Sequence, residues 1–201
     1  PLPTDNEAQG YAAGSRWQFQ GQEWLHAGQG RWVSTVEVTP QAFGARGDGV
    51  ANDTAAIQAA LDWLRDQGGG VLRFPAGAYR VSASALTNTF YNEHASVAAN
   101  GGCLVVWPGV SLVGAGDALI YTDDPTKTVI YQIDPNKSRI TGLEISGSWT
   151  LGQNGAGHGI FTLASTAGKL ADADDCEWSE LTIRNVASYA IGLQNGNPTR
   201  C

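Results

Sequence analysis

The chain has 201 residues, enough for one sizeable domain and a small appendage, and its 26 glycines with only 15% charged residues are typical of a turn-rich β protein. A net charge of −7 and the lack of a Lys/Arg run argue against a nucleic-acid partner. No apolar segment approaches the ~18 residues of a membrane span, so we expect no membrane partner either.

The first 36 residues divide into two parts. Residues 1–10 are polar and contain proline, which predicts a linker. Residues 11–36 are rich in aromatic side chains that alternate before a glycine turn, which predicts a small β-module. The spacing of these residues is similar to that of chitin-binding-type modules. The rings are either the only core of the module or a surface that stacks on sugar rings, with Trp24 and Trp32 as candidate substrate-binding residues.

Residues 53–67 carry the pattern of an amphipathic helix. Asn52 or Asp53 can accept the first free helix N–H groups, and Ile57 and Leu61 belong to one apolar stripe. Three glycines end the helix, and two short extended segments follow. A helix before short, regularly interrupted strands is expected to cover the open end of a stacked-strand solenoid, because a terminal repeat has no neighbour over its core.

Four motifs in this region resemble one known group. They are Phe43-Gly44-Ala45, Gly47-Asp48-Gly49, Asp53-Thr54-Ala55-Ala56-Ile57-Gln58 and Phe74-Pro75-Ala76-Gly77-Ala78-Tyr79-Arg80-Val81. Together they resemble the start of the pectate-lyase superfamily, which includes pectate lyases, polygalacturonase-like hydrolases, alginate epimerases and bacteriophage tailspikes. The resemblance implies an all-β fold, a right-handed parallel β-helix over residues 37–201 with one N-terminal capping α-helix. One architecture hosts many reactions, so the resemblance implies the fold more firmly than the chemistry.

From Val71 onward, short apolar segments alternate with Gly, Asn, Asp and Pro turns, which predicts strands. The predicted strands after position 100 are Cys103–Trp107, Val110–Gly114, Thr128–Tyr131, Ile140–Ile145, Gly159–Phe161 and Leu181–Ile183. An approximate repeat supports stacking, because the pattern at 143 recurs at 181, an offset of 38, and the pattern at 158 recurs at 189, an offset of 31. The chain reaches Cys201 on an apparent strand without a cap, so we expect the β-helix to be truncated at its C-terminus.

Two glutamates are candidate catalytic acids. If Leu143 and Ile145 point inward, Glu144 points outward and stacks on Thr182, with Glu180 diagonal to it. Neighbouring strands lie about 4.8 Å apart, which matches the carboxylate separations of roughly 5–9.5 Å used in glycoside hydrolysis. The alternative is that both are ordinary solvated side chains.

His158 and Tyr189 hold corresponding places in the repeat and are candidates for general acid or base. The alternative is that each is a hydrogen-bonded residue at a strand boundary. Alginate epimerases carry Tyr-Gly-Phe-Asp-Pro-His after a similar strand, whereas this chain reads Tyr189-Ala-Ile-Gly192-Leu-Gln194. The tyrosine matches, but Gly192 and Gln194 hold the places of the acid and the base, which argues against the epimerase mechanism.

The remaining candidates concern metals and thiols. We expect no cofactor, although the resemblance would permit Ca²⁺ on Asp172, Asp174 and Asp175 in place of a hydrated acidic loop. The three cysteines form no C-x-x-C pair. We therefore expect buried, unpaired thiols, with a disulfide involving Cys201 as the alternative.

The resemblance, together with the aromatic-rich segment before it, implies a polysaccharide-degrading protein, either a lyase or a glycoside hydrolase, that is tailspike-like and found outside the cell or on a virion tail. Its partner is then a polysaccharide, and a tailspike would form a homotrimer. The catalytic residues are either among the candidates above or beyond Cys201. The alternative is a non-catalytic protein that binds glycan or builds a tail or surface structure.

Overall fold

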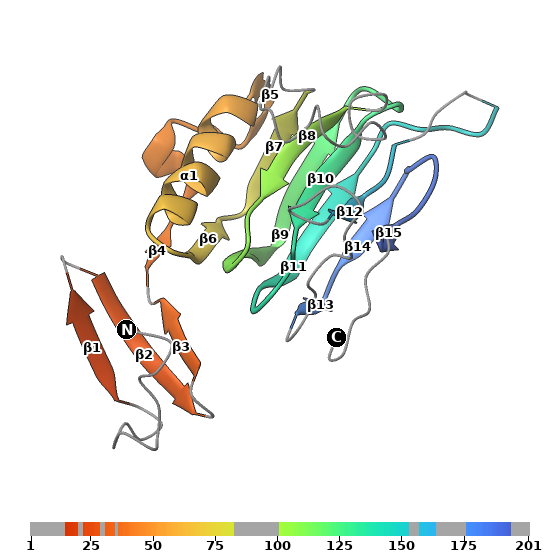
Figure 1. Ribbon diagram of the computed structural model, residues 1–201. Coiled ribbons are helices and arrows are strands. Elements are labelled where there is room, and N and C mark those ends of the chain that lie inside the picture. The colour runs from red at the N-terminus through yellow and green to blue at the C-terminus, as the bar shows by residue number, and fades with distance from the viewer. Residues whose placement is uncertain are drawn as a thin grey trace.

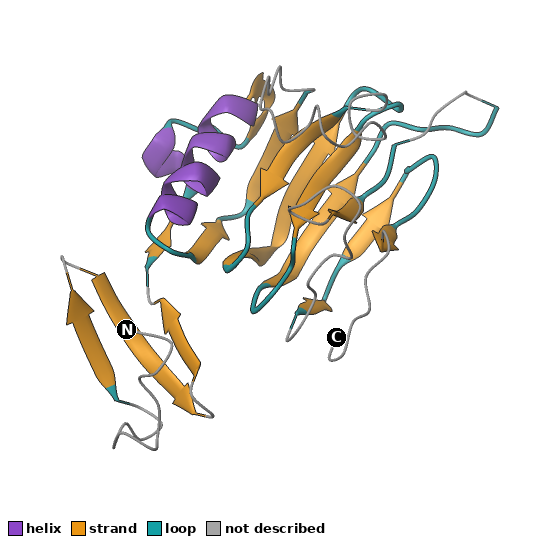
Figure 2. Cartoon of the chain, viewed as in Figure 1, coloured by secondary structure: helices purple, strands orange, loops and turns teal. Residues whose placement is uncertain are grey.

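The computed structural model describes residues 15–19, 22–28, 31–34, 36–82, 101–152, 157–163 and 176–193. Strands dominate these residues, and a single α-helix, α1 (Thr54–Asp66), lies beside the first of the parallel strands (Figures 1 and 2). No helix among the described residues is long and apolar enough to cross a membrane.

Three antiparallel strands form a small sheet of their own near the N-terminus. They are β1 (Arg16–Phe19), β2 (Gln22–Gly28) and β3 (Arg31–Ser34). Trp17 lies opposite Trp24, and His26 lies opposite Trp32. The predicted module at 11–36 thus contains β structure, while its boundaries stay predictions. The side chains of Trp24 and Trp32 lie outside the described residues, so their proposed contact with sugar also stays a prediction.

All other strands pair in parallel and fall into three stacks. The first stack contains β4 (Glu37–Val38), β6 (Gly70–Phe74), the first halves of β9 (Val110–Thr122) and β11 (Arg139–Ser146), and β13 (Glu177–Ser179). The second contains β5 (Asp48–Asn52), β7 (Gly77–Val81), the second halves of β9 and β11, and β14 (Thr182–Arg184). The third contains β8 (Gly102–Val106), β10 (Thr128–Ile133), β12 (Ile160–Leu163) and β15 (Ile191–Leu193).

Each stack places one apolar side chain above another from turn to turn. The aligned positions are Leu72, Leu112 and Ile140 in the first stack, Tyr79, Ile120, Ile145 and Ile183 in the second, and Leu104, Ile130, Ile160 and Ile191 in the third. The predicted parallel stacking and both repeat offsets are therefore confirmed. The closure of the three stacks into a right-handed solenoid stays a prediction.

Burial follows this arrangement. The predicted core residues Leu112, Leu143 and Ile145 are buried. Leu181 and Ile183 are only partly buried and pack against the edge of the same core. The reason is positional, because β14 pairs with β11 on one side and with no described strand on the other.

The helix begins differently from one of the two expectations. Asn52 Oδ1 accepts the N–H of Thr54 at 3.1 Å, whereas the buried Asp53 carboxylate turns back and accepts the N–H groups of Arg46 and Gly47 at 2.8 and 2.9 Å. Asp53 therefore closes the glycine-rich turn before the helix, and Asn52 serves the helix N-terminus.

The side chain of Gln58 forms two hydrogen bonds to the backbone at the open edge of the third stack. Its Oε1 accepts the N–H of Val105 at 2.9 Å, and its Nε2 donates to the carbonyl oxygen of Val105 at 3.2 Å. Because β8 is the edge strand of this sheet, Gln58 takes the place of a neighbouring strand. Ile57 and Leu61 are buried on the same helix. The wider role of α1 as a cap for the solenoid stays a prediction.

Candidate functional site

Three of the sequence-predicted site residues, Glu144, His158 and Tyr189, fall in two regions of the stacked strands. We call the first the ion-pair face; it consists of Arg80, Tyr121, Asp123, Glu144 and Arg184 on the second stack and the turn after β9. We call the second the His158 corner; it consists of Phe161 and Gly192 on the third stack, with His158 and Tyr189 just before the strands β12 and β15.

Glu144 points outward from β11 between two buried neighbours, as predicted. It lies in register with Thr182, so the predicted stacking of these two residues is confirmed. Its Oε1 accepts a hydrogen bond from Nε of Arg184, a residue on the next turn. The side chain of Arg184 is 53% exposed and that of Glu144 is 31% exposed. The carboxylate that was predicted as a catalytic acid is thus held by a guanidinium.

Glu180 does not lie on a strand. It occupies the corner between β13 and β14, where its backbone has a left-handed φ of 51°. Gly142 holds the same corner one turn earlier, with a φ of 67°. The alternation of side chains along a strand therefore does not set the direction of Glu180. A catalytic pair of Glu144 and Glu180 stays a prediction.

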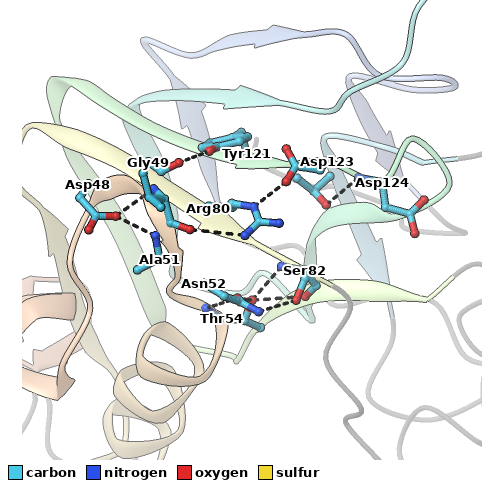
Figure 3. Close-up of polar contacts among 12 residues, drawn as sticks. Asp48, Gly49, Ala51, Asn52, Thr54, Arg80, Ser82, Tyr121, Asp123 and Asp124 are labelled. Carbon is cyan, nitrogen blue, oxygen red and sulfur yellow. Dashed lines mark hydrogen bonds and ion pairs between the residues drawn. The ribbon is translucent and has the colours of Figure 1, made fainter.

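At the other end of the ion-pair face, Arg80 and Tyr121 bond to a carboxylate and to the backbone of β5 (Figure 3). Arg80 bonds Asp123 through Nε at 2.5 Å and the carbonyl oxygen of Val50 through Nη1 at 3.4 Å. The Tyr121 hydroxyl donates to the carbonyl oxygen of Gly49 at 2.6 Å. These contacts tie β7 and β9 to the backbone of β5, so the charges and the hydroxyl already have partners within the protein.

Asp48 bonds to the backbone of β5 where the register of this strand shifts against β7. Its Oδ1 accepts the N–H groups of Val50 and Ala51 at 2.9 and 2.8 Å (Figure 3). These backbone hydrogen bonds lower the pKa of the Asp48 carboxyl. Asp48 thus has the local structural role that Asp residues have in tight turns.

His158 is buried in a stack of rings at the start of β12. Only 9% of the residue is exposed. Its ring lies between Phe161, at 4.5 Å between centroids and 22° between planes, and Tyr189, at 5.4 Å and 13°. Nδ1 accepts the backbone N–H of Tyr189 at 3.2 Å, which places the ring proton of the neutral form on Nε2. Burial lowers the pKa of His158, so the neutral ring is favoured near pH 7.

Tyr189 is the exposed end of this column of rings. It is 61% exposed, and it lies one turn above His158, as the repeat predicts. On the inner side, Phe161 contacts the buried Tyr131 edge to face, with ring centroids 6.2 Å apart. The column therefore runs from a buried ring to one whose outer part meets solvent.

Gly192 provides the space for Phe161. A Cβ at Gly192 would lie 2.7 Å from Cε2 of Phe161, which is closer than real Cβ contacts. The place that holds an acid in the alginate-epimerase motif is thus filled here by an aromatic ring from the turn below. Sequence reasoning noted Gly192 but not Phe161. The signal was available, because an offset of 31 aligns Phe161 with Gly192.

The predicted metal and thiol sites have separate outcomes. Asp172, Asp174 and Asp175 lie outside the described residues, so their binding of Ca²⁺ stays a prediction. Within the described ranges, no group of three or more His, Cys, Asp or Glu side chains could hold a metal. Cys103 is a free, buried thiol whose pKa is raised by desolvation to about 11. Cys176 is disulfide-bonded, so the expectation of unpaired thiols is wrong for this residue.

The chain is similar to a pectate lyase-like family and to named epimerases and a lyase. Residues 36–92 match the model of the family described as rhamnogalacturonase A/epimerase, pectate lyase-like. The chain is 42% identical over 101 residues to mannuronan C5-epimerase AlgE4 of Azotobacter vinelandii, and 36% identical over 108 residues to alginate lyase 7 of the same organism. These segments cover 50% and 54% of this chain but only 15% and 10% of the two relatives.

Solved structures support the same relationship. The A-module of mannuronan C-5 epimerase AlgE4 from A. vinelandii matches with a TM-score of 0.57 at 27% identity, over 78% of this chain and 40% of that structure. The A-module of AlgE6 from the same organism matches with a TM-score of 0.58 at 25% identity, over 77% and 39%. The predicted resemblance to the pectate-lyase-like β-helix proteins is therefore confirmed.

Proposed function

We propose that this chain belongs to a β-helix protein that modifies an acidic polysaccharide of the alginate class. The observation that carries the proposal is the 42% identity over 101 residues to a mannuronan C5-epimerase. The similarity to an alginate lyase supports the same class of substrate with a different outcome of the reaction. The chain spans a small part of both relatives, so the activity, substrate and partners of the whole protein are part of the proposal.

A lyase-type reaction fits the candidate residues better than hydrolysis. Lysis and C5 epimerisation of a uronate polymer both begin when a base removes the proton next to the carboxyl group. A lyase then expels the oxygen at C4 and leaves a double bond, whereas an epimerase returns a proton to the opposite face. Hydrolysis instead needs two carboxyl groups roughly 5–9.5 Å apart. Glu144 is held by Arg184, and Glu180 lies in a corner, so we rank hydrolysis second.

We place the contact with the polysaccharide at the His158 corner. Tyr189 offers an exposed ring face that can stack on a sugar, and a hydroxyl that can donate a hydrogen bond or a proton. Its place also matches the tyrosine of the alginate-epimerase motif. Gly192 and Gln194 stand where that motif has its acid and base, so the base must be a different residue if this chain removes a proton.

Charge limits how such a polymer can bind. A net charge of −7 opposes the long-range approach of a polyanion. Binding must therefore come from short-range contacts, such as ring stacking at Tyr189 and the exposed guanidinium of Arg184 five residues before it. Arg184 can reach a sugar carboxylate only by sharing or releasing Glu144.

An extracellular location is part of the same proposal. Alginate-type polymers lie outside the cell, and the disulfide at Cys176 is expected in oxidising compartments. The tailspike-like role, the virion tail and the homotrimer have no further support and stay predictions.

The test is incubation of the full chain with polymannuronate in D₂O, followed by NMR and ultraviolet absorbance. Epimerisation or reversible proton removal introduces deuterium at C5, lysis produces the unsaturated sugar, and hydrolysis produces reducing ends alone. We expect deuterium at C5 or the unsaturated product. If the polymer binds but none of the three signals develops, modification by this chain is excluded.

The second candidate function is non-catalytic binding of the same class of polymer. Two observations favour it. Nδ1 of His158 already accepts a backbone N–H, and the ring of Phe161 fills the space over Gly192. Binding without any product in the D₂O experiment would establish it.

A further inference from the structure

The backbone of Tyr189 is held at both of its polar groups by the two residues one turn before it. Its N–H donates to Nδ1 of His158 at 3.2 Å, and its carbonyl oxygen accepts the N–H of Gly159 at 3.0 Å. The preceding residues Ala187 and Ser188 both donate to the carbonyl oxygen of Gly157 at 3.1 Å. Among these four hydrogen bonds, only the one to His158 involves an ionisable side chain.

We propose that His158 is a positioning residue for Tyr189: its neutral ring holds the backbone and the phenol ring of Tyr189 where they meet the polysaccharide, and protonation of His158 releases them. The contact of Tyr189 with polysaccharide rests on the function proposed above. The positioning itself can be measured without any ligand.

Protonation reverses the role of the nitrogen that faces Tyr189. In the neutral ring Nδ1 is an acceptor, but in the imidazolium both ring nitrogens are donors. Nδ1–H and the backbone N–H of Tyr189 would then point at each other, and neither would have an acceptor. The buried ring would also carry a charge, which is unfavourable without a partner. The ring and the Tyr189 turn therefore have to separate.

The described surroundings of His158 contain two aromatic rings and a cation but no anionic partner for the charged form. Phe161 and Tyr189 cover the two faces of the ring, and the Thr128 hydroxyl meets the backbone N–H of His158 at 3.3 Å. Lys127 lies one turn before His158, and its ammonium group lies beside Gly101, a further turn back. No described carboxylate forms an ion pair with His158, and burial is the cause of its lowered pKa.

The ligand-free experiment is an NMR titration of the isotope-labelled full chain from about pH 8 to about pH 5. The nitrogen shifts of the His158 ring report the tautomer and the titration, and amide hydrogen exchange reports the protection of Tyr189. We expect a neutral ring with its proton on Nε2 at the upper end. As the ring titrates, exchange at Tyr189, corrected for the intrinsic effect of pH, should accelerate about tenfold, as for loss of one hydrogen bond.

Two variants separate positioning from general packing. In His158→Asn the side-chain oxygen stands as many bonds from the backbone as Nδ1 and accepts the same N–H without titrating, so protection of Tyr189 should no longer depend on pH. In His158→Leu no acceptor remains, so protection should be low at every pH. His26→Asn, the same substitution in β2, is the matched control and should keep the pH dependence of the original chain.

The proposal is overturned if His158 titrates while protection of Tyr189 stays constant, or if His158→Asn shows the same pH dependence as the original chain. The first of these results is measured on the original chain, so the proposal can be tested even if His158→Asn does not fold.

Binding of alginate oligosaccharides is then compared for the original chain and His158→Asn at about pH 7.5 and about pH 5. The polymer stays ionised in this window, because carboxyl groups titrate near pH 4. We expect the affinity of the original chain to fall at least about threefold more than that of the variant. Equal losses in both proteins would overturn the link to binding. No binding by either protein at either pH, with the exchange results as expected, would overturn the proposed function and leave the positioning intact.

Discussion

The ion-pair face and the His158 corner lie on the same turns of the stacked strands but are built from different interactions. At the ion-pair face, the exposed side chain of Arg184 meets the partly exposed side chain of Glu144, and such an ion pair near the surface contributes at most about 1 kcal/mol. At the corner, a buried ring is fixed by two stacked neighbours and a backbone hydrogen bond. A side chain held before its ligand arrives loses less entropy on binding. The comparison therefore favours Tyr189 over Arg184 as the main contact.

The largest expected effect comes from removing the buried ring. His158→Ala should lower the free energy of unfolding by about 2–4 kcal/mol, because it leaves a cavity between two rings and removes the acceptor of the Tyr189 N–H. Urea denaturation measures the change. Thr182→Ala, at an exposed position in register with Glu144, is the control and should stay within about 0.5 kcal/mol of the original chain. Similar losses in both variants would erase the contrast between the two regions.

Adding a methyl group at Gly192 should have the next largest effect. Gly192→Ala should cost about 1–3 kcal/mol, because its Cβ would overlap the ring of Phe161. The double variant with Phe161→Leu should recover part of this loss, since the smaller side chain frees the space. A thermodynamic cycle over the four proteins gives the coupling energy, and a coupling near zero would mean that Phe161 does not occupy the space over Gly192.

The stability of the fold should depend on pH through His158. The folded state depresses the pKa of His158 below its value of 6.5 in the unfolded chain, so the unfolded chain binds more protons as the pH falls. The contribution of His158 is therefore fully present above about pH 6.5 and is lost progressively below it. Urea denaturation of the original chain and His158→Asn between about pH 5 and 8 should show the loss only in the original chain.

The smallest effect is expected at the ion pair itself. Arg184→Gln should change the free energy of unfolding by less than about 1 kcal/mol, because Arg184 is exposed and Glu144 is partly exposed. Arg73→Gln, which removes another exposed pair, with Glu37, is the matched comparison. A loss above about 2 kcal/mol for Arg184→Gln alone would show that the ion-pair face is more rigid than its exposure indicates.

The sequence predicted the parallel stacking and the alignment of His158 with Tyr189, because a repeated apolar spacing leaves few registers that bury every apolar residue. The hydrogen-bond partners of individual polar side chains were harder to predict. Asn52 and Asp53 are both good N-terminal helix residues, and only the folded glycine turn shows that Asp53 serves Arg46 and Gly47. The corner conformation of Glu180 was also missed, because a left-handed backbone is uncommon for glutamate and no glycine marks this turn.

The other features that the sequence did not predict are contacts between residues far apart along the chain. Gln58 was expected only as part of a motif, and its pairing with the edge of β8 depends on how α1 packs against a strand 47 residues later. The hydrogen bond from Tyr189 to His158 likewise depends on the exact height of one turn above another. Sequence spacing brings these two residues together but does not indicate which of their atoms meet.

The most direct test of the central claim is an NMR titration of the isotope-labelled full chain with alginate oligosaccharides at about pH 7.5, where His158 is neutral. Our account predicts that the largest amide shifts cluster at residues 157–161 and 187–193, around His158 and Tyr189. Shifts confined to the ion-pair face, at Arg80, Tyr121, Glu144 and Arg184, would contradict it.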